Sequence, residues 1–149
     1  MRLRSFSVTN YRSFKDPQRI EFSDDSRNVT AIYGPNGAGK TNLYKAMMFY
    51  RDFIHTSTRF EGQTMQYEEF LLSTSAGKIP TSFEAEMKKG NKIYQYGFSL
   101  LLGIVKDEYL KIRNENDSHF DIIFRRNSMN KENRYAEKGF GSDLLKRTR

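Results

Sequence analysis

The chain has 149 residues, of which 37% are hydrophobic, a mean hydropathy of −0.77 and a net charge of +7. Its length suits one domain or a piece of a larger one, and one interpretation of the low hydrophobic content is that some core partners lie elsewhere. The absence of cysteine excludes disulfides and cysteine metal sites. No apolar stretch approaches the roughly 20 residues of a membrane span, so we expect a cytoplasmic protein with no membrane partner.

The positive charge is concentrated at the two ends of the chain. Residues 1–20 carry a net charge of +4 and residues 125–149 a net charge of +5, which leaves −2 for the middle. Basic ends of this kind suit a contact with nucleic acid. They also suit an ordinary solvated surface with a polar tail, and the composition alone leaves both interpretations open.

The N-terminal third predicts three strands. Residues 2–11 and 18–23 alternate apolar and polar side chains, as half-buried strands do. Residues 23–28, SDDSRN, have the composition of a turn. Residues 29–33, VTAIY, form a short apolar run rich in β-formers, which predicts a buried central strand.

The apolar period then changes from two to 3.6 residues, which predicts an amphipathic helix over about residues 40–54. Its apolar face consists of Leu43, Ala46, Met47, Tyr50 and Ile54.

From Pro80 onward the alternation returns and predicts an antiparallel β-meander. The expected strands are residues 81–87, 92–101, 104–112 and 119–126. Residues 88–91, KKGN, and Gly103 supply the turn chemistry between them. Residues 127–149 are polar, and we expect them to be loose or to need a partner.

Between the third predicted strand and the helix, residues 34–41 read GPNGAGKT and fit the pattern G-x-x-x-x-G-K-[ST] at every fixed position. A glycine-rich turn at a helix N-terminus lets the backbone wrap a phosphate. Lys40 is then placed for the β- and γ-phosphates, and the Thr41 hydroxyl for Mg²⁺. The alternative is a glycine-rich turn that ends in Lys-Thr by chance; the strand predicted before it and the helix after it argue against that.

Residues 34–47, GPNGAGKTNLYKAM, resemble the GxNGxGKSNLLxAI run of ABC-type ATPase heads of the SMC/RecF group, in which the asparagine of the loop is typical. Residues 10–16, NYRSFKD, resemble the N-F-R-S-F-x-D segment that opens these proteins. The resemblance implies ATP and Mg²⁺ as cofactors and places Arg12 near the nucleotide phosphates. An arginine after an aromatic residue is otherwise read as a surface side chain. The nucleotide-binding residues so implied are Arg12, Asn36, Gly37, Ala38, Gly39, Lys40, Thr41 and Asn42, with Thr41 also on the metal.

The meander resembles a narrower set, the OLD-like (overcoming lysogenisation defect) ATP-binding proteins of bacterial defence systems. These carry a YxYGF strand followed by a V..E.L strand, and the matching residues here are Tyr94, Tyr96, Gly97, Phe98, Glu108 and Leu110. This likeness implies a role in anti-phage defence. It is less specific than the likeness of the phosphate loop.

Together the resemblances imply an α/β P-loop NTPase fold, the N-terminal lobe of an ABC-type head. A mixed sheet would surround the phosphate loop and helix, and an antiparallel β-meander would follow. The expected organisation is a nucleotide-binding core at 1–56, a connecting loop at 57–80, a β-lobe at 81–126, and a polar basic segment at 127–149 leading to a missing C-terminal part.

Hydrolysis by such a head needs a Walker B run that ends in Asp-Glu and a Ser-Gly-Gly signature. Residues 100–108, LLLGIVKDE, fail as Walker B because Lys106 separates the apolar run from Asp107 and Glu108, and Gly103 interrupts the strand. We interpret the two acids as solvent-face residues of a strand. Residues 72–77, LSTSAG, lack the paired glycines of the signature. No catalytic residue is therefore predicted within the chain.

A few polar residues have two interpretations. Gln63 or Gln66 is either the glutamine that senses the metal and γ-phosphate in such heads or a polar loop residue. His55 and His119 are isolated, and we interpret them as helix-end or surface residues.

Three functions stay open. The first is an ATP-binding module that hydrolyses ATP once downstream elements and a second protomer complete it, as a homodimer joined through the nucleotide sites. The second is the ATPase portion of an OLD-like nuclease or an SMC-like DNA-repair protein, with nucleic acid as a partner. The third is a nucleotide-dependent regulatory module that does not hydrolyse ATP and works with a toxin or effector.

Overall fold

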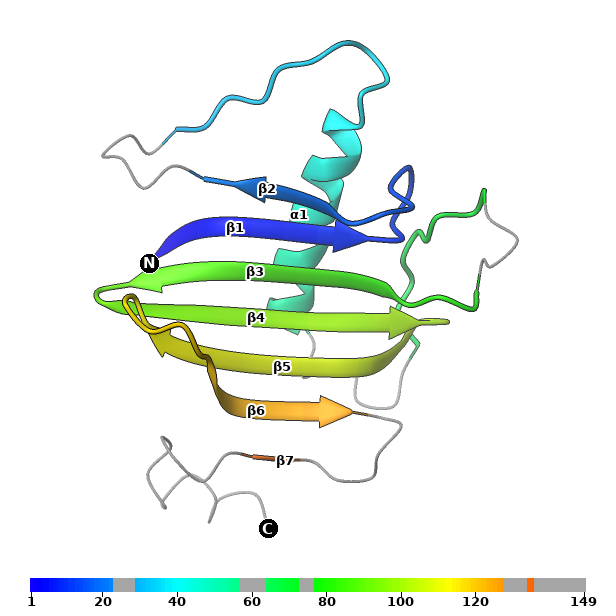
Figure 1. The fold of residues 1–149 in the computed structure, drawn as a ribbon. Helices are drawn as coiled ribbons and strands as arrows, with labels where there is room; N and C mark the ends of the chain where they lie inside the picture. Colours follow the sequence, from blue (N-terminus) through cyan, green and yellow to red (C-terminus); the bar gives the residue numbers. More distant parts are fainter. Residues whose placement is uncertain (23–28, 57–63, 73–76, 128–133, 136–149) are drawn as a thin grey trace.

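The computed structural model describes residues 1–22, 29–56, 64–72, 77–127 and 134–135. Their strands form one seven-stranded sheet, and a helix lies against one face and runs across the strands (Figure 1). In chain order the elements are β1 (Arg2–Thr9), β2 (Gln18–Glu21), α1 (Lys40–Thr56), β3 (Thr81–Lys89), β4 (Lys92–Leu101), β5 (Ile104–Asn114), β6 (Asp121–Asn127) and β7 (Arg134–Tyr135).

The strands lie in the order β2-β1-β3-β4-β5-β6-β7, and each neighbouring pair is antiparallel. The meander expected after Pro80 is confirmed by β3 to β6. The strands β1 and β2 join the same sheet, since Phe6 pairs with Ile20 on one side and with Ala85 on the other. Segments before and after the helix therefore share one core, and the four-part division of the chain stays a prediction.

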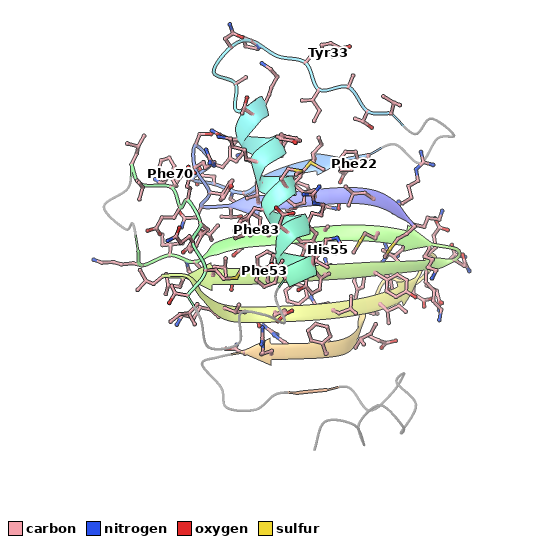
Figure 2. All side chains as sticks on the ribbon, turned by 180° about the vertical axis from the view of Figure 1, so that it is seen from behind. Phe22, Tyr33, Phe53, His55, Phe70 and Phe83 are labelled. Atoms are coloured by element: carbon pink, nitrogen blue, oxygen red, sulfur yellow. The ribbon has the colours of Figure 1, made fainter. Side chains whose placement is uncertain are left out.

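The expected mixed sheet around the phosphate loop is wrong for the described residues, whose strand pairs are all antiparallel. Residues 29–33 were expected to be a buried central strand, yet they form no strand, and Val29 and Tyr33 are 84% and 90% exposed. Figure 2 shows Tyr33 on a segment that extends away from the sheet. A central strand needs hydrogen-bonding neighbours, and no described segment pairs with these residues.

The core lies between α1 and the face of the sheet that it covers. Alternate residues of three adjacent strands point toward the helix, and Phe6, Phe83 and Phe98 are at most 2% exposed. The helix contributes Tyr50 and Phe53, and the Phe53 ring stacks on Phe98 with centroids 3.6 Å apart. Such aromatic burial dominates the energetics of a small core.

The helix begins where it was expected and continues to Thr56. Its buried face includes Ala46 and Tyr50, as expected, but the expectation for Ile54 is wrong, because this side chain is 43% exposed. Phe53 replaces it at the interface. A spacing of three residues after Tyr50 keeps Phe53 on the sheet side of the helix.

The two acids of β5 lie on opposite faces of the sheet. Asp107 faces away from α1 and accepts two hydrogen bonds from Arg125, at 3.0 and 3.2 Å. Glu108 faces the helix side, is 8% exposed, and accepts from the Tyr96 hydroxyl at 2.7 Å and from Arg126 at 2.5 Å. The expectation that Glu108 faces solvent is therefore wrong. Burial, and then the Glu108 charge, raise the pKa of Tyr96.

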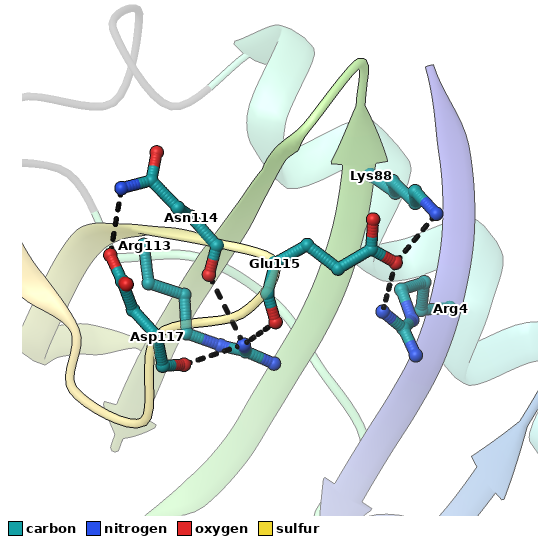
Figure 3. Close-up of polar contacts among 6 residues, drawn as sticks. All are labelled: Arg4, Lys88, Arg113, Asn114, Glu115 and Asp117. Carbon is teal, nitrogen blue, oxygen red and sulfur yellow. Dashed lines mark hydrogen bonds and ion pairs between the residues drawn. The ribbon is translucent and has the colours of Figure 1, made fainter.

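Basic side chains at one end of the sheet have partners within the fold (Figure 3). The Glu115 carboxylate accepts from Lys88 at 2.6 Å and lies 3.6 Å from the Arg4 guanidinium. Arg113 donates to the backbone carbonyls of Asn114, Glu115 and Asp117. These contacts join β1, β3 and the loop after β5, and they give Arg4 of the basic N-terminal block a structural role without nucleic acid.

Candidate phosphate-binding site

The glycine-rich loop at residues 34–39 leads directly into the first turn of α1. Gly37 and Gly39 have φ values of 85° and 87°, a region that favours glycine. The first helical hydrogen bond runs from the Leu43 N–H to the Gly39 carbonyl at 2.9 Å. The first turn contains no acidic residue, so no side chain of that turn neutralises its free N–H groups and the positive end of the helix dipole.

Lys40 lies across the mouth of this loop. Its ammonium donates to the carbonyl oxygens of Gly34 and Pro35, at 2.6 and 2.7 Å. Within the described residues, no carboxylate pairs with Lys40. A glycine turn, a helix N-terminus and a cation without an acidic partner together fit a phosphate group.

The described residues supply only part of a Mg²⁺ site. Thr41, at the second helical position, is exposed and has the hydroxyl that such loops offer to Mg²⁺. The described ranges contain no group of three or more His, Asp or Glu side chains arranged to hold a metal ion. The set fits Mg²⁺ in the usual nucleotide manner, in which phosphate oxygens and water supply most of the ligands.

Residues 10–16 form a tight turn beside the loop. The N–H groups of Tyr11 and Phe14 each donate to the other residue's carbonyl, at 2.9 and 2.8 Å. The turn brings Ser13 within 2.7 Å of the Asn42 side-chain amide. It also brings the Phe14 ring so close to Gly39 that a Cβ there would lie 2.8 Å from Cε1. The motif at residues 10–16 and the loop at residues 34–41, which are 18 or more positions apart in the sequence, are therefore in direct contact.

Arg12 has partners of its own in this turn. Its guanidinium forms an ion pair with Glu68 and lies 5.8 Å from the Tyr11 ring centroid. Its backbone N–H donates to the Glu68 carbonyl at 3.1 Å. The structure therefore brings the Arg12 segment to the phosphate loop but holds the Arg12 charge against a carboxylate. A phosphate contact for Arg12 stays a prediction.

The sequence had no signal for Glu68, which lies on a connection with no clear periodicity. We call residues 64–70 the strap. Its Met65 N–H donates to the Gly103 carbonyl at 2.9 Å, and its Phe70 N–H donates to the Asn10 carbonyl at 3.3 Å. Phe70 is labelled in Figure 2. The strap links the β4–β5 turn to the Arg12 turn.

A groove of about 610 Å³ runs along the strap, and Arg12, Phe49, Gln66 and Glu68 contribute to its lining. Gln66 is exposed there, so its assignment as a sensor or as a loop residue stays open. Gln63 and residues 73–76, the greater part of LSTSAG, lie outside the described residues.

The fold also explains the segment that resembles a Walker B run and the two histidines. Leu102 and Gly103, with φ values of 52° and 75°, form the turn between β4 and β5. Residues 100–108 therefore span two strands of a meander and do not form a single Walker B strand. His55 at the end of α1 and His119 are exposed, which confirms their interpretation as helix-end and surface residues.

A family model described as an AAA domain matches residues 5–147, nearly the whole chain. The chain belongs to this family. The match spans the phosphate loop, the Arg12 turn and the β-meander, so these are parts of one AAA domain.

Curated relatives of this AAA domain include two kinds of protein. The chromosome partition protein Smc of Halobacteriovorax marinus is 30% identical over 92 residues, which cover 61% of this chain and 7% of that protein. The DNA replication and repair protein RecF of Chlorobium phaeobacteroides is 32% identical over 77 residues, 52% of this chain and 18% of that protein. The Smc protein of Lactiplantibacillus plantarum is 38% identical over 47 residues, 32% and 4% of the respective chains.

These relatives confirm the resemblance to the SMC/RecF group, whereas closeness to the OLD-like set stays a prediction. The chain spans less than a fifth of the length of each of the three. No helix among the described residues of this AAA domain combines the length and apolar character that crossing a membrane requires.

Proposed function

We propose that the chain is the ATP-binding, N-terminal part of an ABC-type ATPase head. The observation that supports this most is Lys40, whose ammonium lies across a glycine turn at the N-terminus of α1 without an acidic partner among the described residues. The backbone N–H groups of the loop and Lys40 bind the phosphates, Thr41 binds Mg²⁺, and Arg12 adds a second cation. The proposed nucleotide-binding set is Arg12, Asn36, Gly37, Ala38, Gly39, Lys40, Thr41 and Asn42.

Hydrolysis requires elements that the chain does not contain. We propose that a C-terminal part of the same protein supplies the Walker B acids, and that a second protomer supplies the signature, as a homodimer joined through the nucleotide sites. The short share of each relative that the chain spans leaves room for such a part.

The relatives, chromosome partition proteins and a DNA replication and repair protein, favour DNA processing as the cellular role. We propose that this cytoplasmic head drives chromosome partition or DNA repair, with nucleic acid as a partner. An OLD-like protein with a role in anti-phage defence is the narrower version of the proposal. It rests on the YQYGF strand at residues 94–98 and on Glu108. A toxin or effector partner belongs to that version.

The test uses the full-length protein that carries this chain. Replacing Lys40 by alanine removes the cation at the loop mouth, and the affinity for ATP with Mg²⁺, measured by calorimetry, is expected to fall roughly tenfold or more, as for a charged hydrogen-bond donor. Lys45→Ala on the exposed side of the same helix is the matched control. An unchanged affinity of the Lys40 variant contradicts the proposal. ATP binding without phosphate release in the wild-type dimer would favour a regulatory module instead.

A further inference from the structure

The strongest unexplained feature near the proposed site is the ion pair between Arg12 and Glu68. Arg12 is the one residue of the proposed nucleotide-binding set that already has a charged partner among the described residues. Its side chain is 20% exposed and that of Glu68 is 63% exposed, so water reaches the carboxylate more freely than the guanidinium. The pair lies at the groove along the strap, which both residues line.

The Arg12 turn is fixed to the phosphate loop by its next two residues. Ser13 accepts a hydrogen bond from Asn42 at 2.7 Å, and Phe14 packs against Gly39. Arg12 itself has a φ of 51°, a conformation that bulky residues adopt only when the surroundings enforce it. The turn therefore keeps the Arg12 backbone close to the loop, while the side chain is directed to the strap.

If the Arg12 guanidinium binds a triphosphate and the Glu68 carboxylate at the same time, it brings two anions close to each other. Like charges that share one site disfavour each other, and the guanidinium gives up part of its bond to Glu68 when a phosphate oxygen takes the same donors. Glu68 therefore opposes the anion that Arg12 would help to bind.

We propose that Glu68 is a positioning residue that lowers the affinity of the site for nucleotide by holding Arg12 on the strap. This inference rests on the proposed function. ATP binding then exchanges the carboxylate of Glu68 for phosphate oxygens around Arg12, and the affinity reflects the difference between the two partners. A nucleotide-free protein keeps Arg12 paired and its turn ordered.

The strap does not depend on the carboxylate for its position. Three backbone hydrogen bonds hold it: Met65 to Gly103, Phe70 to Asn10, and Arg12 to Glu68, at 2.9, 3.3 and 3.1 Å. A Cβ at Gly103 would lie 2.5 Å from the Met65 carbonyl oxygen, so the strap and the β4–β5 turn fit closely. Glu68→Gln removes the charge and keeps the side-chain size, and we expect this variant to fold as the wild type does.

The test is the affinity of the full-length protein for ATP with Mg²⁺, measured by calorimetry for the wild type and for Glu68→Gln. The variant is expected to bind ATP about two- to fivefold more tightly, the range of one exposed ion pair. The gain is expected to shrink at high salt, where exposed charges are screened. Asp121→Asn, which removes an exposed carboxylate of β6, is the charge-matched control and is expected to leave the affinity unchanged.

A double-mutant cycle with Arg12→Gln tests whether Glu68 acts through Arg12. In the Arg12→Gln background, Glu68→Gln is expected to give little or no gain. An equal gain in both backgrounds overturns the proposal, because the carboxylate would then act as a general negative charge. A damaged fold cannot mimic the expected result, since it would weaken binding.

The outcomes separate this inference from the proposed function. If Lys40→Ala weakens binding tenfold or more but Glu68→Gln leaves the affinity unchanged or lowers it, the role of Glu68 is overturned and ATP binding at the loop stands. If the wild-type protein binds no ATP, or if Lys40→Ala leaves the affinity unchanged, the proposed function and this inference both fail.

Discussion

The side-chain amide of Asn42 donates a hydrogen bond to the Ser13 hydroxyl at 2.7 Å, across 29 positions of sequence. Asn42 lies in the first turn of α1, and Ser13 lies in the turn that carries Arg12. Together with the packing of Phe14 on Gly39, this contact makes one unit of the phosphate loop and the Arg12 turn. The relative position of Lys40 and Arg12 depends on it.

The first prediction concerns this hydrogen bond. Ser13→Ala removes the acceptor, so the Arg12 turn loses its tether to α1, and the affinity for ATP is expected to fall about two- to tenfold, the range of a neutral hydrogen bond. Calorimetry on the full-length protein measures it. Asn42→Ala removes the same hydrogen bond, and because Asn42 belongs to the proposed nucleotide-binding set its loss is expected to be at least as large. The double variant is expected to be no worse than Asn42→Ala alone. Additive losses would show that the two side chains act separately.

A second prediction compares two glycines of the loop. Both have positive φ values, 85° at Gly37 and 87° at Gly39. A Cβ at Gly37 meets nothing within 4 Å, whereas a Cβ at Gly39 would lie 2.8 Å from the Phe14 ring. Gly37→Ala therefore carries only backbone strain, of order 1–3 kcal/mol. Gly39→Ala adds the clash, and it is expected to lower the thermal midpoint further and to weaken ATP binding more strongly.

The comparison has an internal check. In Gly39→Ala, replacing Phe14 by leucine removes the ring atoms that the new Cβ would meet, and part of the lost stability is expected to return. The same Phe14→Leu change in the wild type should only lower stability, because it removes a packed ring. Equal destabilisation by Gly37→Ala and Gly39→Ala would contradict the steric account.

The meander and the helix could be predicted from the sequence because each depends on local information. Alternation at residues 81–112 and the turn at Gly103 need only neighbours along the chain, and the structure has strands and a turn at those places. The phosphate loop was recognisable for the same reason. Its glycines, Lys40 and the start of α1 lie within a few consecutive residues.

Features that depend on distant partners were missed. Residues 29–33 have the composition of a strand, but composition does not supply the neighbour that a strand must pair with, and no described residue does. The sequence around Glu108 predicts an exposed residue. The register of the sheet places Arg126 and Tyr96 beside it, and this pairing cannot be derived from its neighbours along the chain. Glu68 was missed entirely, since its partner Arg12 is 56 residues away.

A third prediction concerns the two acid–arginine pairs of β5 and β6. Glu108→Gln leaves the Tyr96 hydroxyl an acceptor but removes the charge beside Arg126, at a residue that is 8% exposed. The expected loss of unfolding free energy is about 1–3 kcal/mol, as for a charged hydrogen bond. The matched change Asp107→Asn acts on a more exposed carboxylate, 24% against 11% for the Glu108 side chain, while the two arginines differ little, 48% against 40%. About 0–1 kcal/mol is expected for this pair.

Urea unfolding followed by circular dichroism measures both variants. Hydrogen exchange in β5 and β6 gives a second readout, because loss of the Glu108 contact should raise exchange there and leave β1 unaffected. If Asp107→Asn and Glu108→Gln lower the unfolding free energy by the same amount, burial does not decide the strength of these pairs.

The last prediction concerns the contribution of Tyr50 to the loss of stability at alkaline pH. Burial, followed by the charge of Glu84, raises the pKa of this phenol above its usual value of 10.0. A group whose pKa is raised by folding contributes stability that is fully present below the unfolded pKa and is lost as pH rises above it, because the unfolded chain then releases the proton first. At about pH 10 the unfolded phenol is half ionised, and as pH rises further the contribution of Tyr50 to the loss of unfolding free energy approaches about 1.4 kcal/mol per pH unit. Tyr50→Phe should be less stable at pH 8, since it loses the hydrogen bond to the Tyr96 carbonyl at 3.0 Å, but its stability should fall less steeply between pH 10 and 11. Urea midpoints of the wild type and of Tyr50→Phe at pH 8, 10 and 11 test this. If the two proteins lose stability in parallel as pH rises, the Tyr50 phenol ionises in the folded state as readily as in the unfolded chain, and the prediction is wrong.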